Sequence, residues 1–166
     1  MTAPLLTQFA FLVFCASLVL AAANDLRHYL IPNRYPAAIG FAYLVYAAGH
    51  PVQLGVIGLA IGAAMLAVGA MLFAGRIMGG GDVKLLAATA LWAGPDLLPI
   101  FLFATALAGA VISVTWLTPL RRLMPAAPVA ETVSRVGLRA RLSQPIPFGV
   151  AIAAGGLCLA AMLARP

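Results

Sequence analysis

The chain has 166 residues, of which 64% are hydrophobic and only 8% are charged. Average soluble domains carry about 25% charged residues, and a soluble fold of this size could not bury so much apolar surface. The composition therefore excludes a water-soluble globular domain and a disordered chain. It predicts an integral membrane protein with a single transmembrane domain, residues 1–166.

Four apolar stretches are long enough to cross a bilayer, which takes about 20 residues: Pro4–Ala23, Val52–Ala74, Leu97–Thr118 and Ile146–Ala164. Two shorter ones lie between them, at Tyr35–Gly49 and Leu85–Gly94. The first of these can begin near Ile31. The second can run from Asp82 to Leu98, although Pro95 weakens its far end. The sequence predicts an all-α polytopic membrane bundle of about six transmembrane helices, and leaves open whether 35–49 and 85–94 span fully.

The cations set the predicted orientation. With the N-terminus outside, nine of the ten Lys and Arg residues fall in inner loops, which agrees with the positive-inside rule: Arg27, Arg34, Arg76, Lys84, Arg121, Arg122, Arg135, Arg139 and Arg141. The net charge of +6 is then a topology signal. We expect a protein of the cell inner membrane whose partners include the lipid bilayer and not nucleic acid.

Gly58 and Gly62 form a G-x-x-x-G step in the apolar stretch Val52–Ala74, with Gly55 and Gly69 nearby. Small residues let helix backbones approach closely in lipid. Packing within the bundle is the favoured interpretation. A dimer interface, and hence a homo-oligomer, stays open.

Cysteine and histidine are too sparse for a disulfide framework or a metal site. Cys15 and Cys158 both lie inside apolar runs, and His28 and His50 lie in different loops. We expect neither a metal nor another cofactor.

The basic loop at 119–145 is expected on the cytoplasmic side. Four small apolar residues share one helical face there, and charged residues share another: Val129, Val133, Val136 and Ala140, against Glu131, Arg135 and Arg139. A short basic helix on the membrane surface and a solvated connector fit this pattern equally well.

Carboxylates are scarce. Of the four, Asp96 falls in an outer Gly-Pro-Asp turn, and Glu131 has arginine partners on its own helix. Asp25 ends the first span and Asp82 follows Gly79-Gly80-Gly81, so both lie at similar depth on the inner side. Ionisable groups at the edge of a membrane bundle are costly and usually functional. The alternatives are salt bridges, of Asp25 with Arg27 or Arg34 and of Asp82 with Lys84 or Arg76.

Three consecutive glycines are expensive at a helix end. They free the backbone for unusual torsions and let another segment come close. Two neighbouring carboxyls cannot both ionise easily, so the pair shares one proton. One member can then act as a base toward water while the other, as an acid, polarises a carbonyl group.

Two motifs make the chain resemble the prepilin peptidases, membrane aspartic proteases that process type IV pilin precursors. The first is an aspartate ending the first span and followed by Ile-Pro-Asn, here Asp25 and Ile31-Pro32-Asn33. The second is G-x-G-D-x-K, here Gly79–Lys84. A softer match is Pro-aromatic-Gly at Pro147–Gly149. The size resembles the short peptidases of Flp/Tad pilus systems.

The resemblance implies that Asp25 and Asp82 are the catalytic pair of an aspartic endopeptidase. Its substrate would be a pilin precursor with a basic leader and a hydrophobic helix, cleaved at the cytoplasmic membrane face for pilus assembly and protein secretion. Gly79, Gly81, Lys84, Pro32 and Asn33 would be supporting residues. We expect Pro32 to set a turn or start the second span and Asn33 to cap that helix, while Lys84 either positions Asp82 or simply reaches the headgroups.

Larger members of that family carry a cysteine-containing insertion and also methylate the new N-terminus. Here the loop between the first two spans is short and has no cysteine, so methyltransferase activity is not expected. Two alternatives remain. One is a small transporter or channel subunit that uses the same aspartates as ion sites. The other is a structural subunit of a secretion machine.

Overall fold

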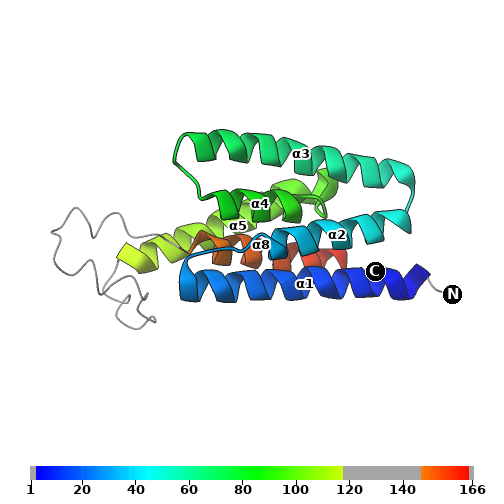
Figure 1. The fold of residues 1–166 in the computed structure, drawn as a ribbon, viewed down its shortest axis with the longest axis horizontal. Helices are drawn as coiled ribbons and strands as arrows, with labels where there is room; N and C mark the ends of the chain where they lie inside the picture. The colour runs from blue at the N-terminus through cyan, green and yellow to red at the C-terminus, as the bar shows by residue number, and fades with distance from the viewer. Residues whose placement is uncertain (1–2, 118–146, 165–166) are drawn as a thin grey trace.

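The computed structural model describes residues 3–117 and 147–164, and Figure 1 shows their arrangement. These residues form six α-helices and no strand: α1 (Ala3–His28), α2 (Arg34–Ala48), α3 (Val52–Ala74), α4 (Gly80–Ala90), α5 (Gly94–Leu117) and α8 (Phe148–Leu163). Successive helices run in alternating directions along one long axis (Figure 1). The all-α prediction is confirmed.

Within residues 3–117 and 147–164, three helices are long and apolar enough to cross a membrane, namely α1, α3 and α5. The bounds of α3 coincide with the predicted stretch. The stretch at 146–164 gives a shorter helix than expected, because α8 starts only after Pro147 and has 16 residues. At 1.5 Å per residue it measures about 24 Å, less than a hydrocarbon core of about 30 Å. The six-span count and the orientation stay predictions.

The fourth helix does not take the extension to Leu98 that the sequence allowed. Helix α4 ends at Ala90, and the chain turns through Gly94, whose φ of +59° suits glycine. Asp96 then lies in the first helical turn of α5, where it is exposed. It is not in a free turn as predicted, but a carboxylate is also favourable at a helix N-terminus.

The core lies where α1, α2, α4 and α8 meet. Trp92, just after α4, stacks on Phe14 at 4.5 Å between ring centroids and meets Tyr43 edge-on at 5.8 Å. The outward faces of α3 and α5 are apolar and exposed, with side chains such as Met71 and Phe103 about 70% accessible. Such surfaces fit lipid as their environment.

The small-residue face of α3 packs inside the molecule, as favoured from the sequence. All four of its predicted glycines are buried: Gly55, Gly58, Gly62 and Gly69. A Cβ added at Gly69 would stand 2.6 Å from Val83 of α4. The two readings of the basic loop at 119–145 concern residues that lie outside the described part of the chain.

Candidate active site

Three helix ends meet at one end of the bundle, the left end in Figure 1. Asp25 lies in the last turn of α1, Asp82 is the third residue of α4, and Gly149 is the second residue of α8. The charge of Asp25 acts on Asp82. The prediction that the two aspartates lie at the same end, although far apart in sequence, is therefore confirmed.

Asp25 is 5% exposed and faces the start of α8. Its Oδ2 accepts a hydrogen bond from the backbone amide of Gly149 at 2.8 Å. The amide of Val150 donates to the carbonyl of Pro147 at 3.3 Å, and it also favours the ionised form of the Asp25 carboxyl. The first amides of a helix have no intrahelical partner and carry partial positive charge. The first turn of α8 therefore forms a binding position for a carboxylate, which is called the α8 amide site below.

Asp82 occupies the third position of its own helix and is half-buried. Its carboxyl accepts from the backbone amide of Gly79, the residue that caps α4. An acidic residue that reaches back in this way forms half of a capping box. Burial first, and then the nearby charge of Asp25, raise the pKa of Asp82 from 3.8 to about 6. A carboxyl with that pKa can hold a proton close to neutral pH.

Ile31 joins the two halves of the site. A Cβ added at Gly81 would stand 3.0 Å from the Ile31 Cβ, and one added at Gly149 would stand 2.8 Å from Oδ2 of Asp25 and 2.5 Å from Cδ1 of Ile31. The glycine run therefore permits close approach, as predicted. Unusual torsions were also expected and are not found, because Gly79 is extended (φ −70°, ψ 143°) and Gly80 and Gly81 are helical.

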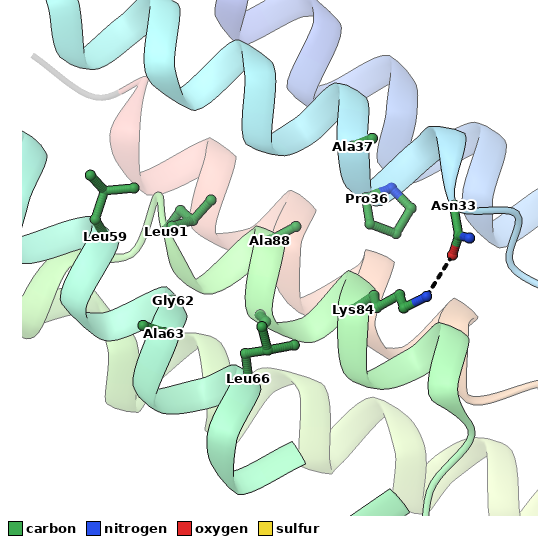
Figure 2. Close-up of a pocket in the computed structure, with 11 residues that line it drawn as sticks. Asn33, Pro36, Ala37, Leu59, Gly62, Ala63, Leu66, Lys84, Ala88 and Leu91 are labelled. Carbon is green, nitrogen blue, oxygen red and sulfur yellow. Dashed lines mark hydrogen bonds between the residues drawn. The ribbon is translucent and has the colours of Figure 1, made fainter. Parts of the chain in front are cut away.

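Lys84 does not contact Asp82. Its Nζ donates to Oδ1 of Asn33 at 2.9 Å, which links α4 to the start of α2 (Figure 2). The pair marks one end of an open, largely apolar groove of about 490 Å³ between α2, α3 and α4, whose walls include Ala37, Leu66 and Leu91 (Figure 2). Neither aspartate lines this groove.

Two expectations for the segment before α2 have different outcomes. Pro32 lies in a turn, as predicted, because its carbonyl accepts from the amide of Tyr35 at 3.2 Å. Asn33 holds the N-cap position but makes no side-chain cap. Its backbone is already helical (φ −57°, ψ −21°), whereas a capping side chain requires an extended one.

None of the four salt bridges considered as alternatives is present among the described residues. Arg34 donates to the hydroxyl of Tyr35 at 3.0 Å and lies over its ring at 4.9 Å. Arg76 is exposed, with a φ of +57°. Both carboxyls receive backbone amides instead, so their charges are not neutralised by side-chain cations.

The chain matches the model of the type IV leader peptidase family over residues 12–114. It is 32% identical to the prepilin leader peptidase/N-methyltransferase of Bacillus subtilis and 31% identical to that of Dichelobacter nodosus, in each case over 92% of this chain. It covers 55% and 48% of these relatives, about half their length. No solved structure matches the chain significantly. The chain belongs to the type IV leader peptidase family.

The sequence does not predict the hydrogen bond between Asp25 and the α8 amide site. In the sequence, Gly149 belongs to the softer Pro-aromatic-Gly motif, which implies no role for it. The contact is made by a backbone amide 124 residues away from Asp25. The one available signal was a glycine just after Pro147, where a helix begins beside the site.

Proposed function

We propose that this protein is a prepilin leader peptidase, an aspartic endopeptidase that removes the basic leader of a pilin precursor. Two carboxyls from distant parts of the chain lie at one end of the bundle, close enough for their charges to interact. That single observation carries the proposal, and membership of the type IV leader peptidase family supports it.

The proposed chemistry is hydrolysis by a carboxyl pair that shares one proton. The ionised member draws a proton from water, and the protonated member donates to the oxygen of the scissile carbonyl. The raised pKa of Asp82 supports this assignment of one proton to the pair. We name Asp25 and Asp82 as the catalytic residues, with Gly79 and Gly81 supporting their geometry.

The site would face the cytoplasm from the inner membrane. Four cations lie at or near the helix ends around the site, in the arrangement that the positive-inside rule gives for a cytoplasmic face: Arg27, Arg34, Arg76 and Lys84. A pilin with a basic leader and a hydrophobic helix would present its cleavage site at that depth. The short first loop favours a pilus system of the Flp/Tad type.

Coexpression with a candidate pilin precursor tests the proposal. Intact-mass measurement should show leader loss with the wild-type protein and none with Asp25→Asn or Asp82→Asn. Asp96→Asn is the matched control, because this exposed carboxyl lies at the start of α5, and it should process normally. If ion flux in proteoliposomes accompanies intact precursor, the two aspartates are ion sites and the peptidase proposal is wrong.

A further inference from the structure

The two carboxyls of the site are held differently. Asp25 lies at the start of another helix and accepts a hydrogen bond from its Gly149 amide at 2.8 Å. The nearby Val150 amide, which donates to the carbonyl of Pro147, also favours the ionised carboxyl. Asp82 accepts a hydrogen bond from the amide of Gly79 at the start of its own helix, and it also experiences the charge of Asp25. Asp25 is the more buried of the two, and its burial opposes ionisation.

Charge-assisted hydrogen bonds from backbone amides favour the ionised form of a carboxyl. We propose that the first turn of α8 is a positioning element that holds Asp25 as the anionic member of the pair, so that Asp25 acts as the base while Asp82 carries the proton. This assignment rests on the peptidase function proposed above and gives each carboxyl a distinct role.

The proton transfers then balance. The water oxygen bonds to the scissile carbonyl carbon, the water proton passes to Asp25, and the proton of Asp82 passes to the carbonyl oxygen. When the tetrahedral intermediate collapses, the C–N bond breaks and the leaving nitrogen takes the proton from Asp25. One hydroxyl of the intermediate returns its proton to Asp82, which restores the starting state.

Few other charged groups face the pair from the described helices. The described part of α8 has no charged or titratable side chain apart from Cys158, which lies far along the helix. Lys84 of α4 donates to Asn33, and Arg34 of α2 is engaged with Tyr35. The apolar Ile31 packs beside Gly81 of α4 and Gly149 of α8. The backbone amides at the start of α8 are therefore the main feature that favours the ionised form of Asp25 over that of Asp82.

Infrared spectroscopy locates the proton without substrate. Because the chain has only four acidic side chains, a background carrying Asp96→Asn and Glu131→Gln leaves this pair as the only ones. The same background with Asp25→Asn and Asp82→Asn gives the baseline that contains the terminal carboxyl alone. The protonated-carboxyl band is followed in lipid between about pH 3 and pH 8. We expect the part of this band that disappears at the highest pH to be absent in Asp82→Asn. In Asp25→Asn the same part should persist, but it should disappear at a lower pH than in the background protein. If this part persists in Asp82→Asn, or is missing from Asp25→Asn, the assignment is overturned.

Gly149→Ala tests the positioning role directly. The new Cβ would stand 2.8 Å from Oδ2 of Asp25 and push the carboxyl off the amide. We expect kcat for a precursor that wild type cleaves to fall about 10- to 100-fold, the effect of losing a hydrogen bond to a charged group. KM should change little, and the low-pH limb of the kcat profile should move to higher pH.

Gly156→Ala is the matched control on the same helix. Its Cβ would crowd Leu18 at 2.8 Å and Thr89 at 2.9 Å, far from either carboxyl. It should lower thermal stability to a similar extent and leave the pH profile unchanged. Equal pH profiles for the two alanine variants overturn the proposal.

A double variant separates the two contacts of the new methyl group. Ile31→Val removes Cδ1, which a Cβ at position 149 would crowd at 2.5 Å. If the loss acts through Asp25, Gly149→Ala should cost as much in the Ile31→Val background as in wild type. Full rescue by Ile31→Val overturns the proposal. If the wild-type protein cleaves no precursor, the proposed function fails instead, while the infrared result still decides where the proton resides.

Discussion

At the scale of single residues, the ionisation of Asp82 couples the site to stability. With its pKa raised from 3.8 to about 6, the folded protein binds more protons than the unfolded chain between these pH values. Stability contributed by Asp82 should therefore fall as pH rises through that window. The cost arises first because Asp82 is partly buried in the folded protein, and then because the charge of Asp25 lies nearby.

Asp82→Asn should accordingly flatten the pH dependence and raise the melting temperature above about pH 6. The measurement is thermal unfolding of the purified protein in detergent between about pH 4 and pH 8. Asp96→Asn, at an exposed carboxyl, should keep the wild-type slope. An unchanged slope in Asp82→Asn would show that this carboxyl is not strained by its surroundings.

An added methyl group at Gly81 should disturb the packing of α4, which carries Asp82, against Ile31. Its Cβ would stand 3.0 Å from Cβ and 3.3 Å from the carbonyl oxygen of Ile31, which cannot move without the backbone. Because a misplacement of about 1 Å can cost about a hundredfold in rate, we expect Gly81→Ala to lower the cleavage rate roughly ten- to hundredfold.

Gly80→Ala is the matched comparison for Gly81→Ala. Its nearest neighbour would be the ring of Phe73 at 3.3 Å, and that side chain is 56% exposed and free to turn away. Its effect on the rate should be less than about threefold, the factor that corresponds to a fraction of 1 kcal/mol. Equal losses in both variants would contradict a specific role for the close contact between Gly81 and Ile31.

At the scale of elements, the glycine face of α3 packs against α4. Gly69→Val would drive side-chain atoms into Val83, the residue after Asp82. Overpacking of this kind costs about 1–3 kcal/mol, and each kcal/mol lowers the melting temperature of a chain of this size by about 2–4 °C. Ala67→Val, on the exposed face of the same helix, should change the melting temperature little. Similar melting temperatures for both variants would contradict this packing.

The elements also show how far sequence reasoning reached. Long uncharged stretches predicted α1 and α3 well, because apolar length alone indicates a helix that faces lipid. The end of α4 was missed because hydropathy alone does not register the left-handed turn at Gly94. The two aspartates could be proposed as site residues from the sequence because carboxylates are rare in this chain. The partner of Asp25 could not, since any residue type can supply a backbone amide and only the fold decides which one does.

At the scale of the whole molecule, orientation follows from where the cations lie. The end that holds both aspartates should face the cytoplasm, and the α2–α3 turn should face outward. In a variant without Cys15 and Cys158, a cysteine at His50 should react with a membrane-impermeant maleimide in intact cells. A cysteine at Arg76 should react only after lysis. The reverse pattern would place the site outside and contradict the proposed function.

The central claim is that Asp25 and Asp82, brought together from α1 and α4, form one catalytic unit. Groups that act as a unit are strongly non-additive, so removing one costs about as much as removing both. The direct measurement is the rate of leader removal by the purified protein in proteoliposomes, for Asp25→Asn, Asp82→Asn and the double variant. We predict the same background rate for all three. A single variant that cleaves at the wild-type rate, or losses that simply multiply in the double variant, would contradict the claim.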